Sequence, residues 1–435
     1  MTLRRRARPL AAWLRPSGGG SSAAGPASPA AMGLAITPVA ILVLCLGHVF
    51  SNAIRTIPAV SVDVLTRDLG ISAEALAQIT GAFPLAFAVV MIPVGIALDR
   101  HGVKRVALGL LAVAGLGAVL GALATGPWSM LAAQIVLGAG CSGMLMCPIT
   151  FAARGLTTAR FAVWSGLIQA VGNTGMLLSA SPLALLIEAV DWRAGFWACS
   201  GIALLALPLV ALLVPSDRPE AAASRSLGAD VREVARMAAQ PALRGVMVFT
   251  FASFAAVLGL RGLWGGPWLM QVKGLDRVAA GHVLLACTVA LTIGPLLAGL
   301  VLRRIGRAPL LLAGSHLACA GMILLLVAGG PGGWISGLAG LPMLPVAWDL
   351  LLLVLFGLVI SAQVLAFSIV RSAVPPDQAG RALSAVNLFF FAGAAILQAA
   401  SGAMAGWGGP GAALATFAVA LLVCSLGFLV LRPRR

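Results

Sequence analysis

Charged residues are scarce in this chain: they form 10% of its 435 residues, whereas hydrophobic residues form 60%. This balance excludes an ordinary soluble globular domain and is typical of a polytopic membrane protein. In a soluble protein, a net charge of +16 would indicate a nucleic-acid partner, but in a membrane protein the basic residues have to be assigned loop by loop. We therefore expect contact with membrane lipid and no nucleic-acid partner.

Patterns that would indicate an enzyme or a metal site are also missing. All seven cysteines lie in apolar runs, with no C-x-x-C pair and no histidine at ligand spacing. We expect them to be small buried hydrophobic side chains, and we predict no disulfide and no metal. The sequence shows no pairing of a nucleophile with a base, so we predict neither an enzyme nor a cofactor.

Long apolar runs recur about twelve times along the chain. A bilayer core of about 30 Å is crossed by about twenty helical residues, and these runs lack the alternation of transmembrane strands. The expected fold is an all-α polytopic membrane protein with helices near 36–61, 75–98, 104–126, 128–151, 161–187, 193–215, 242–267, 279–302, 309–329, 345–370, 381–404 and 410–431.

Basic residues predict the orientation of these helices. With the N-terminus inside, 23 of the 29 lysines and arginines fall on the inner side, and the outer side holds only Arg67, Arg193, Lys273 and Arg277. The positive-inside rule then places both termini in the cytoplasm and the protein in the cell (inner) membrane. Eight of the ten tryptophans fall near the predicted outer boundary, as interfacial anchors do: Trp128, Trp192, Trp197, Trp264, Trp268, Trp334, Trp348 and Trp407.

Composition also divides the chain into parts. Residues 1–35 are rich in Arg, Gly, Ser, Ala and Pro, so we predict a disordered cytoplasmic tail, with Met32 as an alternative start to Met1. The one long polar connector is 216–241, which we interpret as a cytoplasmic linker. The linker separates two predicted six-helix bundles, and a short cytoplasmic tail follows the second: 36–215, 242–431 and 432–435.

The two predicted bundles are related by an internal repeat with a displacement of 204 residues. A glycine and charge pattern between the second and third apolar runs recurs between the eighth and ninth, pairing Gly95, Asp99-Arg100 and Gly102 with Gly299, Arg303-Arg304 and Gly306. Gly70 and Gly274, which precede the second and eighth runs, align at the same displacement.

Twelve spans, a 6+6 repeat and this loop motif together resemble the major facilitator superfamily of transporters. The resemblance implies two bundles around a central cavity that opens alternately to each side, lined by spans 1, 2, 4, 5, 7, 8, 10 and 11. It also implies a gating role for the loop motif and its counterpart in the second half: Gly95, Asp99, Arg100, Gly102, Lys104, Arg105 and Arg303.

Asp99 is the gating residue with a specific physical expectation. It ends span two close to the predicted N-terminus of span eleven, where the helix dipole stabilises a carboxylate by about 0.3–1 kcal/mol. Asp99 is therefore predicted to latch the two halves together on the inner side. The alternative is that the whole cluster only anchors the loop by the positive-inside rule.

Two arginines lie within apolar spans, Arg55 in span one and Arg261 in span seven. Arginine at a helix centre costs about 2.5–3.5 kcal/mol to insert, and none of the thirteen acidic residues falls in the middle of a span. The missing counterion is then the substrate, because guanidinium groups bind carboxylate, phosphate or nitrate through two parallel hydrogen bonds. Snorkelling of both side chains to the outer headgroups is the alternative.

Further polar residues are predicted to share this site. His48, Asn52 and Arg55 lie on one face of span one, and other polar side chains occur on spans that border the implied cavity. The position of Arg55 resembles, to within one residue, that of the span-one arginine that binds the anion in organophosphate/phosphate antiporters and anion:cation symporters. The segment "AVGNTG" (Ala170 to Gly175) partly resembles the signature of nitrate/nitrite transporters. The predicted substrate-binding residues are Arg55, Arg261, Asn52, His48, Gln169, Asn173, Asn387 and Gln363.

The resulting functional prediction is a secondary active transporter of a small organic or inorganic anion that works by alternating access and functions as a monomer. It would act as an exchanger or as a proton-coupled symporter, with His48 as the titratable group for protons. Export of a hydrophobic or cationic compound is an alternative function. A solute sensor of the same fold that does not transport is another.

Overall fold

The computed structural model describes residues 38–156, 158–216, 239–374 and 379–431, together with residues 228, 232 and 235–237. The predicted N-terminal tail, the C-terminal tail and most of the linker lie outside these residues. The described part of the chain is helical throughout and contains no strand. The prediction of an all-α membrane protein is therefore confirmed.

The helices fall into two sets that we call the N-half and the C-half. The N-half contains α1 (Pro38–Ile54), η3 (Ile57–Val60), α2 (Val62–Leu69), α3 (Ala73–His101), α4 (Val103–Ala122), α5 (Pro127–Cys141), α6 (Met146–Gly155), α7 (Thr158–Leu178), α8 (Ser181–Ala189) and α9 (Arg193–Leu213). The C-half contains α11 (Arg244–Gly259), η4 (Leu260–Trp264), α12 (Gly265–Pro267), η5 (Trp268–Val272), α13 (Arg277–Ile305), α14 (Ala308–Ala328), α15 (Trp334–Leu338), α16 (Val346–Ile360), η6 (Ser361–Val364), α17 (Leu365–Ala373) and α18 (Ala379–Leu431).

The lengths of these helices match a chain that crosses the membrane repeatedly. Ten helical segments of the described chain are long and apolar enough to span a bilayer, and α1 is a shorter apolar helix. The 53-residue α18 covers the last two predicted spans, which meet at a kink where Gly408, Gly409 and Pro410 follow one another. Proline lacks a backbone N–H and Gly409 has a φ of 65°, so the helix cannot continue straight through this point.

Equivalent caps define the internal repeat in the structure. The helices α3 and α13 each have 29 residues and begin 204 positions apart. The side chain of Ser72 caps α3 by accepting a hydrogen bond from the Ala75 N–H, and Asp276 caps α13 in the same way through Ala279. Both helices therefore begin at equivalent positions for the same local reason.

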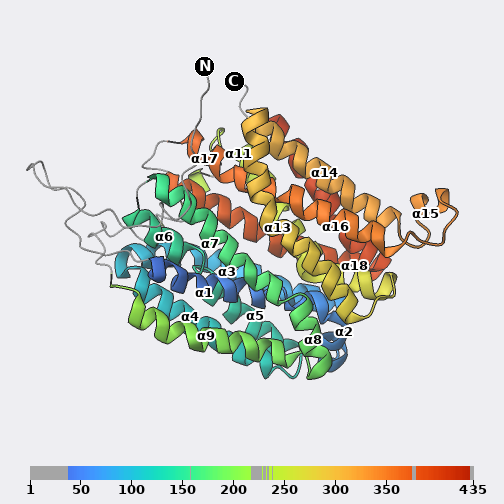
Figure 1. The fold of residues 1–435 in the computed structure, drawn as a ribbon, viewed down its shortest axis with the longest axis horizontal. Helices are drawn as coiled ribbons and strands as arrows, with labels where there is room; N and C mark the ends of the chain where they lie inside the picture. The colour runs from blue at the N-terminus through green and yellow to red at the C-terminus, as the bar shows by residue number, and fades with distance from the viewer. Residues whose placement is uncertain are drawn as a thin grey trace, which may run out of the picture.

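Figure 1 shows the N-half, coloured blue to green, packed beside the C-half, coloured yellow to red. α2 and α8 lie at one end of the molecule, and α6 and α17 lie at the other. We call these the α2 end and the α6 end. The sequence predicts that the α2 end faces outward.

Arg277 joins the two halves at the α2 end. Its Nη1 and Nη2 donate to the two carboxylate oxygens of Asp63 at 2.8 and 2.7 Å, and its Nε donates to Glu188 at 2.7 Å. Both acceptors belong to the N-half, whereas Arg277 starts α13 of the C-half. Close to this cluster, Gly281 packs so tightly against α8 that an added Cβ would lie 3.0 Å from the Cβ of Ala184. The halves are thus in contact at the α2 end.

Three of the tryptophans predicted to be interfacial anchors are instead buried. Trp192, Trp264 and Trp268 are at most 3% exposed. Each indole N–H donates to an internal side chain, so its polar atom needs no headgroup or water: the acceptors are Asp68, Ser401 and Asp349, at 2.9, 2.9 and 2.7 Å. The bond from Trp192 is also the main reason that the pKa of Asp68 lies below its usual range. The interfacial prediction was wrong for these three residues, while Trp128 and Trp407 are largely exposed.

Candidate functional site

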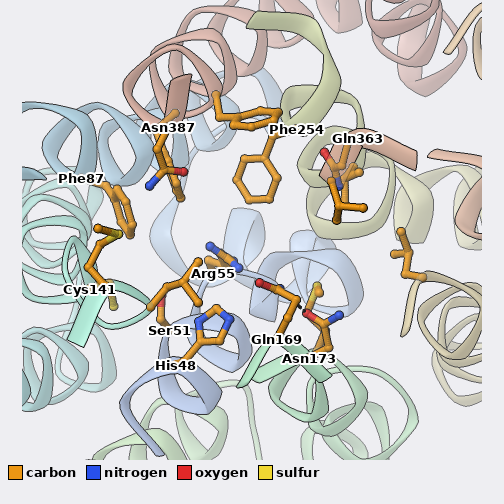
Figure 2. Close-up of a pocket in the computed structure, with 18 of the residues that line it drawn as sticks. His48, Ser51, Arg55, Phe87, Cys141, Gln169, Asn173, Phe254, Gln363 and Asn387 are labelled. Carbon is orange, nitrogen blue, oxygen red and sulfur yellow. Dashed lines mark hydrogen bonds between the residues drawn. The ribbon is translucent and has the colours of Figure 1, made fainter. Parts of the chain in front are cut away.

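A cavity lies between the two halves, with about 960 Å³ of empty space that includes its opening to solvent. Its lining side chains come from α1, α3, α5, α6, α7, α11, α13, η6, α17 and α18 and from the turns after α1 and after α5. These elements correspond to spans 1, 2, 4, 5, 7, 8, 10 and 11, the set that the resemblance implied. Figure 2 shows labelled side chains from both halves converging on this space.

Arg55 reaches the cavity because α1 ends just before it. Pro58 follows within η3, and proline disfavours helical conformation in the residue before it and removes a hydrogen-bond donor. The Thr56 hydroxyl stabilises the resulting turn by donating to the Asn52 carbonyl at 2.9 Å, and it also contacts the hydroxyl of Ser179, which follows α7. The turn leaves the guanidinium of Arg55 in the centre of the view in Figure 2.

The positive charge of Arg55 has no counterion among the described residues. Its guanidinium carbon lies 5.2 Å from the centre of the Phe254 ring, and its buried Nε has no hydrogen-bond partner. No carboxylate of the described chain lies within ion-pair distance. The side chain therefore points into the cavity, which argues against snorkelling to the headgroups. Its charge is available to a bound anion.

His48 also lines the cavity, but Asn52 does not. Asn52 is fully buried, and its Nδ2 lies 3.4 Å from the Nε2 of His48, so it supports that ring from behind the lining. Space for the imidazole comes from Gly172 on α7, where an added Cβ would lie 1.7 Å from the Cδ2 of His48. The three residues predicted to share one face of span one therefore have different roles. His48 and Arg55 line the cavity, and Asn52 supports His48.

The other predicted polar residues of the site all line the cavity: Gln169, Asn173, Gln363 and Asn387. Gln169 donates through Nε2 to the Asn173 side-chain oxygen at 3.1 Å, and Asn387 lies 3.4 Å from the sulfur of Met91 across the interface between the halves. Amides from both halves thus face one space. They offer donors and acceptors to a polar solute.

Arg261 lies outside the cavity lining and is fully buried. It belongs to the π-helical turn η4, from which Nε donates to the Thr288 hydroxyl at 2.5 Å and Nη2 donates to the Met176 carbonyl at 2.7 Å. Met176 is in the N-half, so this arginine connects the two halves. The structure therefore does not place it with the predicted substrate-binding residues, and its Nη1 remains buried without a partner.

The predicted gating motif lies at the α6 end, where α3 ends and α4 begins. Gly102 separates the two helices with a φ of 79°, a conformation that favours glycine. Gly95 lies in the last turns of α3, whereas Lys104 and Arg105 lie in the first turn of α4. The backbones of Asp99 and Arg303 are helical, but their side chains lie outside the described residues. The Asp99 latch therefore stays a prediction.

The aromatic part of the cavity was missed by the sequence reasoning. Phe87 of α3 stacks on Phe391 of α18 with ring centres 3.6 Å apart, and Phe254 approaches the same Phe391 ring at 5.0 Å. A phenylalanine in an apolar span looks like any other lipid-facing or core residue. Only the run Phe389–Phe391, which follows Asn387 closely, was a usable signal.

Sequence comparisons find a family model that matches most of the chain and relatives that match 41% of it. A family model described as Major Facilitator Superfamily matches residues 44–360. The cephamycin export protein CmcT of Amycolatopsis lactamdurans is 30% identical over 190 residues, which cover 41% of this chain and 38% of that protein. A multidrug resistance protein B homolog of Mycobacterium tuberculosis is 31% identical over 185 residues, 41% of this chain and 33% of that protein. The matches therefore span well under half the length of these curated relatives.

Solved structures share the fold over nearly the full chain. A POT family transporter in complex with 5-aminolevulinic acid has a TM-score of 0.74 at 12% identity, covering 92% of this chain and 97% of that one. A D-xylose-proton symporter has a TM-score of 0.72 at 15% identity, with 91% and 98% covered. A mutant of the nucleoside transporter NupG has a TM-score of 0.69 at 14% identity, with 90% and 98% covered.

Proposed function

The chain belongs to the Major Facilitator Superfamily, and we propose that it moves a small anionic solute across the membrane by alternating access. The observation that carries this proposal is the unneutralised guanidinium of Arg55 in the cavity between the halves. A guanidinium away from bulk water binds a carboxylate or phosphate through two charge-assisted hydrogen bonds. The amides of Gln169, Asn173 and Asn387 would then bind the remaining polar atoms of the solute.

Orientation and direction follow from charge. Basic residues such as Arg100, Lys104 and Arg105 lie at the α6 end, so we place that end in the cytoplasm of the cell and both termini with it. An interior-negative potential opposes anion entry by about 2.3 kcal/mol per charge per 100 mV and favours anion exit by the same amount. Export therefore needs no coupling ion, and the relatives named for cephamycin export and multidrug resistance support this direction.

Uptake of an anion would require coupling instead. Among the described residues that line the cavity none is acidic, and His48 is the imidazole among them. Exchange against a second anion needs no titratable group, whereas proton symport would use His48. Counterflow of the solute in liposomes with and without a pH gradient distinguishes these two modes.

The proposal is tested by binding measurements on the purified full-length chain. A panel of carboxylates, phosphates and inorganic oxyanions is screened by thermal stabilisation against wild type, Arg55→Gln and Arg55→Lys. We expect at least one class of anion to raise the unfolding temperature of wild type. The increase should be smaller in Arg55→Lys, which keeps the charge but loses the forked donors, and absent in Arg55→Gln. Arg67→Gln is the matched control, because Arg67 is an exposed arginine at the α2 end. Equal stabilisation of wild type and Arg55→Gln would contradict the proposal.

A second candidate function is export of a hydrophobic compound. Its support is the aromatic wall formed by Phe87, Phe254, Phe390 and Phe391, together with the relative named for multidrug resistance. An uncharged hydrophobic ligand would bind this wall without needing the guanidinium. Binding of such a ligand that is unchanged in Arg55→Gln and lost in Phe254→Ala would favour this second function.

A further inference from the structure

A chain of hydrogen bonds leads from the cavity into the interior of the C-half. Gln363 of η6 lines the cavity, and its Oε1 lies 3.1 Å from the hydroxyl of Ser253 on α11. The same hydroxyl lies 2.7 Å from the Nε2 of His316 on α14. Ser253 and His316 are both fully buried, and neither lines the cavity. Sequence reasoning found Gln363 but missed the two residues behind it.

The other ring nitrogen fixes the tautomer of His316. Its Nδ1 lies 3.0 Å from the Leu312 carbonyl, and a carbonyl oxygen can only accept a hydrogen bond. The Ser315 hydroxyl lies within hydrogen-bond distance of both that carbonyl, at 2.8 Å, and Nδ1, at 3.0 Å. An unprotonated Nδ1 would direct its lone pair at the Leu312 carbonyl oxygen, whereas a protonated Nδ1 donates to it. The proton of a neutral His316 ring is therefore on Nδ1, and Nε2 is an acceptor.

The direction of the chain follows from the single proton of the Ser253 hydroxyl. With Nε2 as an acceptor, that proton goes to His316, so the Ser253 oxygen has to accept from Gln363. Gln363 can donate only through its NH2 group, which leaves its carbonyl oxygen toward the cavity. The opposite placement, with the oxygen of Gln363 toward Ser253, requires protons on both nitrogens of His316. The orientation of one cavity amide thus depends on the charge of one buried imidazole.

The surroundings of His316 favour the neutral ring. The centre of the Phe249 ring lies 4.3 Å from the centre of the His316 ring, in an edge-on arrangement. His316 is 0% exposed. The thiols and carboxylates on its own helix and on the helices packed against it are Cys319, Cys424, Cys287 and Asp349, and Asp349 is already paired with Lys273. The other titratable groups described on these helices are His282, Arg277 and Arg304 of α13 and Arg244 of α11. The side chains of Arg371 and Arg381 lie outside the described residues. With no carboxylate at hand, a buried imidazolium would be uncompensated, which is costly in an apolar interior.

We propose that His316, acting through Ser253, is a positioning residue that turns the carbonyl oxygen of Gln363 toward the cavity. Figure 2 labels both side chains, with the Gln363 amide in the placement that has its oxygen toward Ser253. With the amide turned, the cavity presents a donor, Arg55, from the N-half and an acceptor, Gln363, from the C-half. The matching substrate class is a small solute with an anionic group and a separate N–H or O–H donor, as in amino acids and hydroxy acids. This inference rests on the proposed function and specifies its substrate class.

Matched pairs of ligands test the substrate class on the full-length protein. Each pair differs by one hydroxyl and keeps the same net charge: propionate and lactate, butyrate and 4-hydroxybutyrate, 3-phenylpropionate and 3-phenyllactate. We expect the donor-bearing member of at least one pair to bind wild type roughly three- to ten-fold more tightly, the effect of one added hydrogen bond. Ser253→Ala should bring this ratio close to one because the amide is then free to turn, whereas Ser253→Thr keeps the hydroxyl and should keep the ratio.

The tautomer of His316 is measured directly by nitrogen NMR on protein labelled at histidine, and this measurement needs no variant to be active. The chain has four histidines, so a His316→Gln variant assigns the signal. We expect a neutral ring with the proton on Nδ1. An imidazolium pattern, or a ligand ratio that is unchanged in Ser253→Ala, would overturn the inference.

The outcomes separate the inference from the proposed function. If carboxylates bind in an Arg55-dependent way but the added donor has no effect, only the inference is wrong. If no pair binds but phosphates or inorganic oxyanions do so in an Arg55-dependent way, only the inference is wrong. If no class of anion binds, or if binding is the same in Arg55→Gln, the proposed function is wrong and the inference falls with it.

Discussion

Among single residues, Gly172 has an effect on the cavity out of proportion to its size. It lies on α7 against the His48 ring, with no room for even a methyl group. The close approach of α1 and α7 also depends on Gly175, where an added Cβ would lie 2.0 Å from the Val49 carbonyl oxygen. The partial glycine motif of this segment therefore acts through helix packing rather than through contact with a substrate.

The first prediction concerns this packing. Gly172→Ala should displace the His48 ring, destabilise the protein by about 1–3 kcal/mol and weaken ligand binding, because overpacked interiors shift their neighbours. Thermal unfolding in detergent and ligand stabilisation measure the two effects. Gly166→Ala on the same helix is the control: no atom lies within 4 Å of its added Cβ, and alanine favours a helix over glycine. Equal losses in the two variants would contradict the explanation.

A second prediction concerns the buried pair Lys273–Asp349, whose charged atoms lie 3.0 Å apart at the α2 end of the C-half. The Lys273 ammonium also donates to the carbonyls of Gly329 and Leu344 at 3.3 and 2.9 Å. Asp349→Asn leaves that ammonium without its counterion, and breaking one partner of a buried pair costs about 3–5 kcal/mol.

Thermal unfolding of Asp349→Asn should therefore show a large decrease in midpoint temperature. Arg67→Gln removes an exposed ion pair with Asp68 and should cost no more than about 1 kcal/mol. Similar midpoints for the two variants would show that the buried pair contributes little.

The two intramembrane arginines show what residue patterns can and cannot predict. Both were recognisable as uncompensated charges in apolar spans, and the structure brings Arg55 to the cavity. The sequence could not show that Arg261, unlike Arg55, lies outside the cavity lining. The π-helical turn Leu260–Trp264 changes which face of the helix the Arg261 side chain occupies. A helical projection with a constant period does not contain that turn. The roles of the aromatic wall and of the buried His316 were not predicted either, since both depend on contacts between distant spans.

At the scale of whole elements, the contact between α13 and the pair α2 and α8 holds the halves together at the α2 end. One guanidinium accounts for most of its polar bonds, because Arg277 binds Asp63, Glu188 and the Val60 carbonyl. These partners lie on three elements of the N-half. Alternating access requires this cluster to break whenever the α2 end opens.

The third prediction follows from that cluster. Arg277→Gln should increase the population in which the α2 end is open, since three acceptors lose their charged donor. Spin labels at Val190→Cys and Leu338→Cys, which are exposed sites in the N-half and the C-half, report the separation of the halves at this end in a Cys424→Ser background.

We expect a longer mean distance in Arg277→Gln than in wild type. Arg193→Gln is a matched control, because Arg193 bonds to Asp68 and Ala124 within the N-half alone. The same distance in Arg277→Gln and wild type would mean that the cluster does not hold the halves together.

Element boundaries were predictable where local chemistry determines them. The starts of α3 and α13 follow from a glycine and a capping side chain, and both were visible as a repeat. Breaks within spans were not: residues 142–145 interrupt the fourth span and η6 interrupts the tenth, in runs that are apolar on both sides. The packing of neighbouring helices decides such breaks, and a hydropathy pattern does not record it.

For the molecule as a whole, the structure shows contact at the α2 end, while the predicted Asp99 latch concerns the α6 end. The fourth prediction is that Asp99→Asn and Arg277→Gln change the population with an open α2 end in opposite directions. Arg277→Gln should increase it and Asp99→Asn should decrease it. A helix-dipole contact of about 0.3–1 kcal/mol corresponds to roughly a two- to five-fold change in the ratio of states. With the same spin labels, Asp99→Asn should shorten the mean distance at the α2 end. No change, or a change in the same direction as Arg277→Gln, would contradict the latch.

The buried tryptophans give this chain a built-in optical signal for such movements. It contains ten tryptophans and no tyrosine, so indole dominates its ultraviolet fluorescence. Trp264 lies three residues after Arg261 and is 1% exposed, next to the contact between η3 and η4 of the two halves. Separation of the halves at the α2 end would admit water to this indole and move its emission to longer wavelength. Stopped-flow spectroscopy of the unlabelled protein can therefore follow the transport cycle in real time.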